Sequence, residues 1–266
     1  MILEALQYIR TPCRAEFRKL GFLHEAIALQ ARHKRLHSLW GPHLERCKEL
    51  IRKASRLCPQ HRQVIVLGSG ILSEIPLDFL ARQFKQVVLV DAVHLNAVHD
   101  QVAGYGNVEM IESDITGLAV QLVAMKRRDR ELPTPQPSIP GLCEETDLVI
   151  SANLLSQLCV GPLHYAVPRF GFSNEQYIEW CRDIIDGHIG VLFESGIRTC
   201  LITDLVHVER DREGRELKRE DMLFGSALPD GAWIWEWKLA PVGEVSRRYS
   251  VTAVVNGFVN FPYPGE

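Results

Sequence analysis

A short glycine turn is the feature of this sequence best placed to do chemistry. Residues 64–67 form an apolar, β-branched run, and Gly68, Ser69 and Gly70 follow it directly. Such a run is typical of a strand that is buried on both faces. Glycine lets the backbone turn sharply and lets a ligand approach where a Cβ atom would clash. The pattern predicts a binding site beyond the end of this strand, although a tight turn without a ligand fits the same residues.

Two carboxylates end the next two apolar runs. Asp91 closes residues 87–90, and Asp114 follows residues 108–111. An acidic side chain at the end of the second strand can accept both hydroxyl protons of a ribose. One at the end of the third strand can accept from an exocyclic amine such as that of adenine, or it can cap the next helix. Because the carboxyl ends of parallel strands meet at one rim, we expect the glycine turn, Asp91 and Asp114 to lie together.

From residue 59 onward, apolar strands alternate with short helices. We expect helices over residues 77–84, 94–103 and 174–186, and further strands over 147–150 and 200–206. This alternation predicts βαβ units and a parallel sheet. Two more strands, 232–237 and 249–255, predict an antiparallel hairpin at its edge. Residues 126–141 contain four prolines and a charge cluster, which predicts a flexible surface loop.

The first 58 residues are expected to be helical and to pack on this sheet. Gly41 and Pro42 lie together, so we expect them to split the segment into two helices. His33 and His37 share a helix face at a spacing compatible with a metal ion. No third ligand is evident, so we expect a solvated face or a lid and no metal site. The alternating tryptophans Trp233, Trp235 and Trp237 predict one packing face of a strand, with an interface as the alternative.

Composition narrows the class of protein. The 266 residues are 46% hydrophobic and 24% charged, which is typical of one globular domain with an accessory segment. The formal net charge of −3 shows no basic excess, so we do not expect a nucleic-acid partner. Seven scattered cysteines without a C-x-x-C pair indicate reduced thiols. With no secretory signal and no apolar run of membrane-spanning length, we expect a cytoplasmic protein.

Over roughly residues 60–256 the chain resembles the class I S-adenosylmethionine-dependent methyltransferases. The resemblance rests on the glycine turn, Asp91, Asp114, the strand end at 147–153 and the terminal hairpin. It implies a Rossmann-like α/β fold with a seven-stranded, mostly parallel sheet and an antiparallel C-terminal hairpin. Residues 1–58 would then form an N-terminal helical cap or lid, and residues 59–266 the α/β domain.

The resemblance also implies roles for single residues. The glycine turn would hold the methionine part of S-adenosylmethionine, Asp91 the ribose and Asp114 the adenine, with Asn153 at the end of the fourth strand. Ala92 and Ile115 would give backbone or apolar contacts to the adenosine.

Two positions depart from the family pattern. Val66 stands where the family often has an acidic residue, and Leu72 stands where it often has a third glycine. We therefore expect Glu74 or the N-terminal helices to help hold the methionine end.

Residues after the fourth strand are the candidates for substrate contact. Asn153, Gln157, His164 and Tyr165 follow it on the reactive edge. His164 is a candidate general base, with Tyr165 a second catalytic candidate, although a loop histidine on the surface fits equally. Since N-terminal helices often shape the substrate pocket in the resembled family, Tyr8, His37 and Trp40 are further pocket candidates.

The sequence thus predicts methyl transfer to an O or N nucleophile, with a small molecule as the substrate. One alternative is a nicotinamide-dependent oxidoreductase, because Gly68, Gly70 and Ser73 nearly fit the dinucleotide fingerprint and Asp91 would bind a ribose there too. Another alternative is a non-catalytic scaffold, which the departures at Val66 and Leu72 suggest. The substrate's identity and the oligomeric state do not follow from the sequence.

Overall fold

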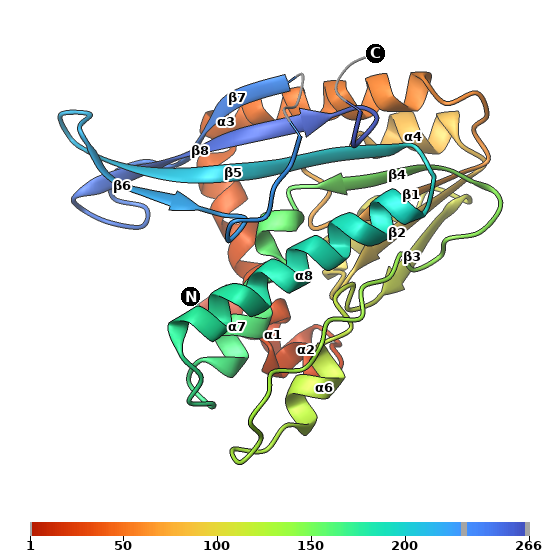
Figure 1. The fold of residues 1–266 in the computed structure, drawn as a ribbon. Coiled ribbons are helices and arrows are strands. Elements are labelled where there is room, and N and C mark those ends of the chain that lie inside the picture. The colour runs from red at the N-terminus through yellow and green to blue at the C-terminus, as the bar shows by residue number, and fades with distance from the viewer. Residues whose placement is uncertain (1, 230–232, 264–266) are drawn as a thin grey trace.

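Eight strands form one sheet at the centre of the molecule (Figure 1). The computed structural model describes residues 2–229 and 233–263. The strand order is β3-β2-β1-β4-β5-β8-β7, and β6 pairs with β5 off this path. The strands are β1 (Gln63–Leu67), β2 (Gln86–Asp91), β3 (Val108–Glu112), β4 (Thr146–Ala152), β5 (Thr199–Asp211), β6 (Glu216–Asp221), β7 (Trp233–Ala240) and β8 (Tyr249–Phe258).

The first five strands form the parallel part of the sheet. Leu67 at the end of β1 pairs with Val90 of β2 on one side and with Ser151 of β4 on the other. β8 then runs antiparallel to β5, and β7 antiparallel to β8. The predicted Rossmann-like fold with an antiparallel C-terminal hairpin is therefore confirmed. Its parallel strands bring their carboxyl ends to one rim.

Both faces of the sheet are buried, which explains why its strands are apolar without alternation. Along β1, Ile65 and Leu67 face one core, whereas Val64 and Val66 face the other. The first core is closed by α6 (Ala119–Ala124), α7 (Val160–Ala166) and α8 (Asn174–Glu194), and the second by α4 (Leu77–Gln83) and α5 (Asn96–Val102).

One long helix joins the two cores. After α1 (Ile2–Arg10) and α2 (Ala15–Lys19), α3 runs from Phe22 to Arg56 (Figure 1). Its early residues Leu23 and Ile27 belong to the first core, and its later residues Cys47 and Ile51 belong to the second. The helix therefore passes from one face of the sheet to the other.

The expected break at Gly41 and Pro42 was wrong, because α3 is continuous through both residues. A proline inside a helix removes one backbone hydrogen bond and costs about 3 kcal/mol. The residues around it compensate: Trp40, His43 and Leu44 are all buried. Each large apolar side chain contributes about 1.5–3 kcal/mol on burial, so packing outweighs the local preference.

The main path of the sheet has the seven strands expected, and β6 is an additional strand beside β5. Every side chain of β6 is exposed, so no apolar periodicity marks it in the sequence. It pairs with the second half of β5, which is longer than expected and reaches Asp211. The hairpin of β7 and β8 is confirmed, although Ala232 of the expected strand lies outside the described residues.

Residues 126–141 form no helix or strand, as expected of a loop. Several hydrogen bonds fasten this segment to its surroundings. Trp180 Nε1 donates to the Pro133 carbonyl at 2.8 Å, and the Gln136 amide donates to the Thr116 carbonyl at 2.9 Å. Its flexibility stays a prediction.

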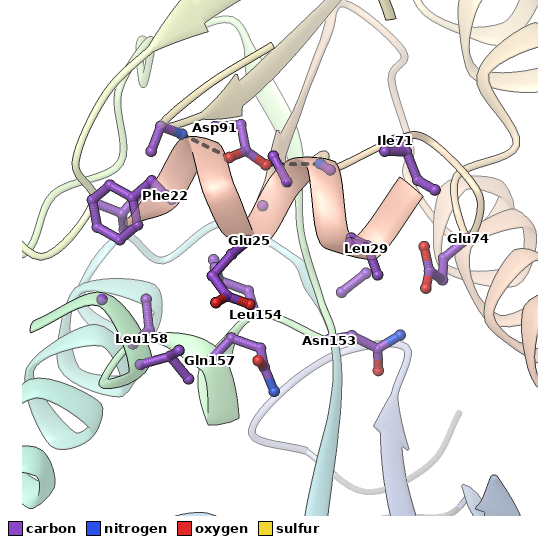
Figure 2. Close-up of a pocket in the computed structure, with 18 of the residues that line it drawn as sticks. Phe22, Glu25, Leu29, Ile71, Glu74, Asp91, Asn153, Leu154, Gln157 and Leu158 are labelled. Atoms are coloured by element: carbon purple, nitrogen blue, oxygen red, sulfur yellow. Dashed lines mark hydrogen bonds between the residues drawn. The ribbon is translucent and has the colours of Figure 1, made fainter. Parts of the chain in front are cut away.

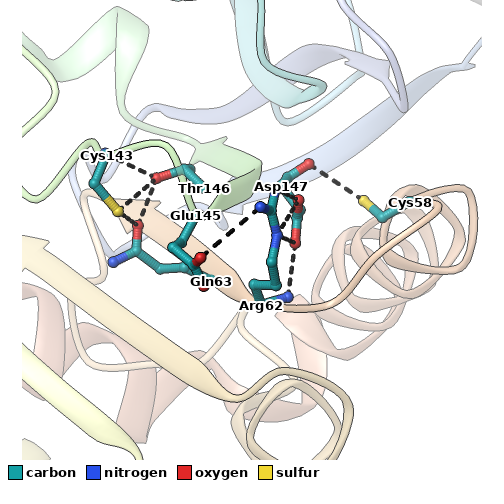
Figure 3. Close-up of polar contacts among 7 residues, drawn as sticks. All are labelled: Cys58, Arg62, Gln63, Cys143, Glu145, Thr146 and Asp147. Carbon is teal, nitrogen blue, oxygen red and sulfur yellow. Dashed lines mark hydrogen bonds and ion pairs between the residues drawn. The ribbon is translucent and has the colours of Figure 1, made fainter.

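The opposite rim, at the amino ends of the strands, is held by a polar network (Figure 3). Arg62 Nη2 lies 2.5 Å from Asp147 Oδ1, and the Arg62 backbone amide donates to Asp147 Oδ2 at 2.6 Å. Thr146 Oγ1 donates to Gln63 Oε1 on the neighbouring strand at 2.5 Å. The bonds from Arg62 lower the pKa of Asp147, although partial burial opposes them. This rim is therefore tied by charge-assisted hydrogen bonds.

We expect Asp147→Asn to lower the thermal midpoint by a few degrees at neutral pH, because the charge-assisted bonds to Arg62 are lost. Since folding lowers the pKa of Asp147 from 3.8, its contribution is present above that value and is lost as pH falls through the folded pKa. Thermal unfolding from pH 7 to pH 3 should show the two proteins converging at low pH. Glu145→Gln, at an exposed side chain 4.0 Å from Arg62, is the control and should change little. A constant gap across this range would contradict the prediction.

Candidate functional site

A cavity of about 350 Å³ opens at the carboxyl rim of the parallel strands. Its floor comes from the ends of β1 to β5, through residues such as Gly68, Asp91 and Asn153. Its cover comes from α3, whose Phe22, Glu25, Ala26, Leu29 and Arg32 line it. Figure 2 shows Glu25 extending from α3 toward Leu154 and Gln157. The volume lies in the range of small-molecule sites.

The glycine turn needs its glycines for geometric reasons. Gly68 has a φ of +69°, and a Cβ atom there would lie 2.9 Å from Leu154 Cδ1. Gly70 has a φ of +55°, and a Cβ atom there would make an ordinary van der Waals contact with Leu29 Cδ2, at 3.8 Å. Leu72, where the resembled family often has glycine, also adopts a left-handed φ of +64°. The turn thus keeps a glycine-like backbone at three positions while a buried leucine occupies the third.

Asp91 joins the glycine turn to the end of β2 (Figure 2). Its Oδ2 accepts from the Gly70 amide at 2.7 Å, and its Oδ1 accepts from the Ala92 amide at 2.7 Å. A carboxylate offers about four lone-pair directions, so further acceptor capacity remains on the cavity side. The predicted meeting of the glycine turn and Asp91 at one rim is confirmed by these bonds.

Asp114 also lines the cavity, but its protein contacts are those of a helix cap. Its Oδ2 accepts from the Ala119 amide at the start of α6 at 2.6 Å, and its Oδ1 accepts from the amide and hydroxyl of Thr116. The capping alternative therefore describes its contacts within the protein. A role toward an adenine amine uses the remaining lone pair on Oδ2 and stays a prediction.

Asn153 sits at the end of β4 in a left-handed conformation, with a φ of +52°. Its carboxamide lies 3.0 Å from His43 Nε2. The other ring nitrogen, His43 Nδ1, is a hydrogen-bond acceptor, because Trp235 Nε1 lies 3.1 Å away and an indole N–H can only donate. Neutral His43 therefore carries its proton on Nε2, which is satisfied when the Asn153 oxygen faces it. The opposite end of the carboxamide is buried and has no protein partner among the described residues.

His43 is locked in an aromatic cluster beside the cavity. Its ring stacks on Trp237 with centroids 4.0 Å apart, and Trp40 packs edge-on against Trp237 at 5.2 Å. Burial lowers the pKa of His43 to about 3, so the ring is neutral at physiological pH. The expected packing face of the tryptophans is thus observed for Trp235 and Trp237, whereas Trp233 is partly exposed.

At the β5 end of the cavity lies a buried carboxylate, Asp204, that is 2% exposed. Ser156 of η1 (Leu155–Gln157) donates its hydroxyl hydrogen bond to Asp204 Oδ1, and His207 Nε2 lies 2.5 Å from Asp204 Oδ2. Burial raises the pKa of Asp204, but the hydrogen bonds from His207 and Ser156, with the positive charge that His207 carries when it is protonated, outweigh burial and lower the pKa. Asp204 and His207 both line the cavity.

The cavity lining is rich in acid. It includes five carboxylates against one guanidinium, that of Arg32, and one imidazole; the acidic residues are Glu25, Glu74, Asp91, Asp114 and Asp204. Electrostatically, such a lining favours a ligand that carries positive charge.

The structure brings most of the predicted site residues together. Those that line the cavity are Gly68, Gly70, Asp91, Ala92, Asp114, Ile115, Asn153, Trp40, Gln157 and Glu74. Ser69 lies beneath the turn, where its buried hydroxyl has no partner among the described residues. These placements are geometric, and the binding roles remain predictions.

Besides Ser69, four predicted residues lie outside the lining. His164 is exposed and packs on Gly21, while Tyr165 is buried beneath the guanidinium of Arg169. Tyr8 packs under Arg18, and His37 is exposed beside His33. Within the described part of the chain these side chains do not reach the cavity. For His164 and Tyr165, the lining includes only the first two residues of α7, Val160 and Gly161.

Several lining residues were not predicted, among them Glu25 and Arg32 of α3 and Asp204 and His207 of β5. The register of β5 shifts between Asp204 and Val206. That shift has no mark in the sequence, although an acid inside an otherwise apolar strand could have drawn attention.

Comparison with known proteins gives structural matches only. No protein-family model matches the chain, and no curated protein matches it by sequence. The N-methyltransferase NodS from Bradyrhizobium japonicum WM9, in complex with S-adenosyl-L-homocysteine, is 14% identical, with 80% of this chain and 85% of that chain covered and a TM-score of 0.35.

Two further matches have different acceptors. The 1,6-didemethyltoxoflavin-N1-methyltransferase of Burkholderia thailandensis is 12% identical, covering 88% and 90% of the two chains, with a TM-score of 0.33. The 23S rRNA methyltransferase ErmE is 11% identical, covering 82% and 71%, with a TM-score of 0.28. At these identities and TM-scores, the structural likeness assigns no activity to this chain. The description of the fold rests on the strand order given above.

None of the helices that the structure describes is both long and apolar enough to cross a membrane. No three acidic, histidine or cysteine side chains within residues 2–229 and 233–263 form a group that could hold a metal ion.

We expect Gly68→Ala to destabilise the protein by roughly 2–4 kcal/mol. The left-handed backbone costs about 1–2 kcal/mol for a residue with a Cβ atom, and the contact with Leu154 adds overpacking strain. Urea unfolding measures the change. Gly104→Ala is the matched control, because nothing lies within 4 Å of its added Cβ. Equal stabilities for the two variants would contradict this account of the turn.

We expect His43 to contribute a pH dependence of stability. Folding lowers its pKa from 6.5 to about 3, so between these values the unfolded chain binds a proton that the folded chain excludes. Stability from His43 is therefore full above pH 6.5 and is lost as pH falls toward 3. Urea unfolding of His43→Gln between pH 7 and pH 4.5 should show a shallower slope than the parent protein. His24→Gln, at an exposed histidine, should keep the parent slope, and an unchanged slope in His43→Gln would refute the assignment.

Proposed function

We propose that this protein is an S-adenosylmethionine-dependent methyltransferase acting on a small molecule. The observation that carries the proposal is the cavity at the carboxyl rim, which gathers the glycine turn, Asp91 and Asp114 in an acid-rich lining under α3. Ligands of open α/β sheets bind at this rim. When bound, the cofactor would supply an electrophilic methyl group on a positively charged sulfur.

The charge of the cavity favours this cofactor over a nicotinamide dinucleotide. A dinucleotide carries an anionic pyrophosphate, which normally rests on a helix N-terminus directly after the glycine turn. Here α4 begins only at Leu77, several residues beyond Gly70. With five carboxylates against one guanidinium, the lining has a net negative charge. This net charge would repel the pyrophosphate and attract a sulfonium.

Each part of the cofactor has a matching group on this chain. The remaining lone pairs of Asp91 would accept the ribose hydroxyl protons, and Asp114 with Ile115 would meet the adenine. Gly68 and Gly70, which line the cavity, would lie beside the methionine part. The unpartnered end of the Asn153 carboxamide offers a further hydrogen bond toward a ligand. An unpaired buried polar group is costly, so a ligand that pairs it gains affinity.

A small-molecule acceptor fits the cover over the cavity. The glycine turn is roofed by α3, and the cavity continues past Asn153 to Gln157, Asp204 and His207. There is thus room beside the cofactor position, which favours an enzyme over a non-catalytic scaffold. An enclosed, partly apolar end suits a small substrate with an O or N nucleophile.

Calorimetry with S-adenosylhomocysteine and with NAD tests the cofactor class. We expect S-adenosylhomocysteine to bind with a one-to-one stoichiometry and NAD to give no heat of binding. Tight binding of NAD without binding of S-adenosylhomocysteine would overturn the proposal.

Asp91→Asn tests the ribose contact. The variant keeps the shape of the side chain but loses its charge, so we expect S-adenosylhomocysteine to bind roughly 10- to 100-fold more weakly, as charged hydrogen bonds contribute about 1.5–3 kcal/mol each. Asp100→Asn, on the exposed face of α5, is the matched control and should bind like the parent. Equal affinities in all three proteins would place the ribose elsewhere.

A further inference from the structure

The β5 end of the cavity contains a histidine–carboxylate pair to which cofactor binding gives no role. His207 Nε2 and Asp204 Oδ2 lie 2.5 Å apart, and Ser156 donates to the other carboxylate oxygen. Gln157, which also lines the cavity, donates in turn to Ser156 Oγ at 3.3 Å. The carboxylate is thus held from two sides.

This hydrogen bonding fixes the state of the imidazole. An ionised carboxylate can only accept, so the nitrogen of His207 that faces Asp204 carries a proton. In the neutral ring the other nitrogen, Nδ1, then has a free lone pair. No hydrogen bond to Nδ1 is found within the described residues, and the His207 side chain is 17% exposed, on the cavity wall.

The strand order places His207 and Asp204 at the other end of the cavity from Asp91 and Asp114, where the adenosine is proposed to bind. Along the rim, the order β3-β2-β1-β4-β5 brings Asp114, Asp91, the glycine turn, Asn153 and Asp204 into succession. A ligand with its adenosine at Asp114 and Asp91 extends across the glycine turn. Its reactive end then faces the ends of β4 and β5.

We infer that His207 is the general base for the methyl acceptor and that Asp204 is its positioning residue. The inference rests on the proposed function and narrows its substrate class. The acceptor is a small molecule whose nucleophile is a neutral O–H or N–H group, because only such a group has a proton for the base to remove. A tertiary amine or a thioether would not need it.

Methyl transfer with His207 as the base needs no reactant besides the acceptor and S-adenosylmethionine. The acceptor's oxygen or nitrogen forms a bond to the methyl carbon with its lone pair, and its proton passes to His207 Nδ1. The carbon–sulfur bond breaks with its electron pair remaining on sulfur, which leaves S-adenosylhomocysteine. Asp204 stabilises the imidazolium through the Nε2 hydrogen bond.

Sinefungin tests this placement without knowledge of the acceptor. In sinefungin, a carbon that bears an ammonium group replaces the sulfur and its methyl, so the ammonium marks the methyl position. If His207 Nδ1 faces that position, it accepts a hydrogen bond from the ammonium, and S-adenosylhomocysteine makes no such bond. Calorimetry of the parent protein, His207→Phe and Asp204→Asn with both ligands measures the difference.

We expect both variants to bind S-adenosylhomocysteine within about twofold of the parent and to bind sinefungin about tenfold more weakly or worse. Asp147→Asn removes a comparable ion pair at the opposite rim and should change neither affinity at a temperature where it is folded. Unchanged S-adenosylhomocysteine binding also shows that the cavity is intact in each variant.

The remaining outcomes distinguish failure of the proposed function from failure of the inference about His207 and Asp204. If the parent protein does not bind S-adenosylhomocysteine, the proposed function fails. If it does bind and both variants weaken the two ligands by the same factor, or neither ligand at all, the pair is away from the methyl group and the inference is overturned.

Discussion

The continuity of α3 is the constraint on which the site depends. The helix is buried in one core at its start and in the other at its end, so it must cross the carboxyl rim between them. Its crossing residues, among them Glu25 and Leu29, close the cavity that the strand ends open. Packing at Trp40, His43 and Leu44 holds the helix together through Pro42. The same two cores therefore fix the position of α3 over the cavity and of the strand ends below it.

The central fold could be predicted because its signals are local and strong. Four apolar runs, each ended by a glycine or a polar residue, became β1 to β4 with the expected order of rim features. β6 could not be predicted, because an exposed strand has no buried face and its charges resemble a loop. The break expected at Pro42 failed for the opposite reason, since tertiary packing overrode a correct local preference.

The part of the cavity proposed to bind the cofactor was more predictable than the part proposed to face the acceptor. Asp91 and Gly70 sit at strand ends, where topology alone brings them within 2.7 Å. Asp204 and His207 lie within a long strand whose register shifts beside them, and Glu25 lies on a helix far away in the sequence. His164 and Tyr165 follow β4 in the chain, yet neither lines the cavity. Proximity in sequence was a poor guide where three-dimensional packing decided the position.

If the protein acts as proposed, the acid-rich lining has a consequence for turnover. A sulfonium ligand would enter with a positive charge that the carboxylates of Glu74, Asp91 and their neighbours attract. Once the methyl group had left, the sulfur would be neutral, and that part of the attraction would disappear. The side chains that help to capture the reactant would therefore give no such help to the product.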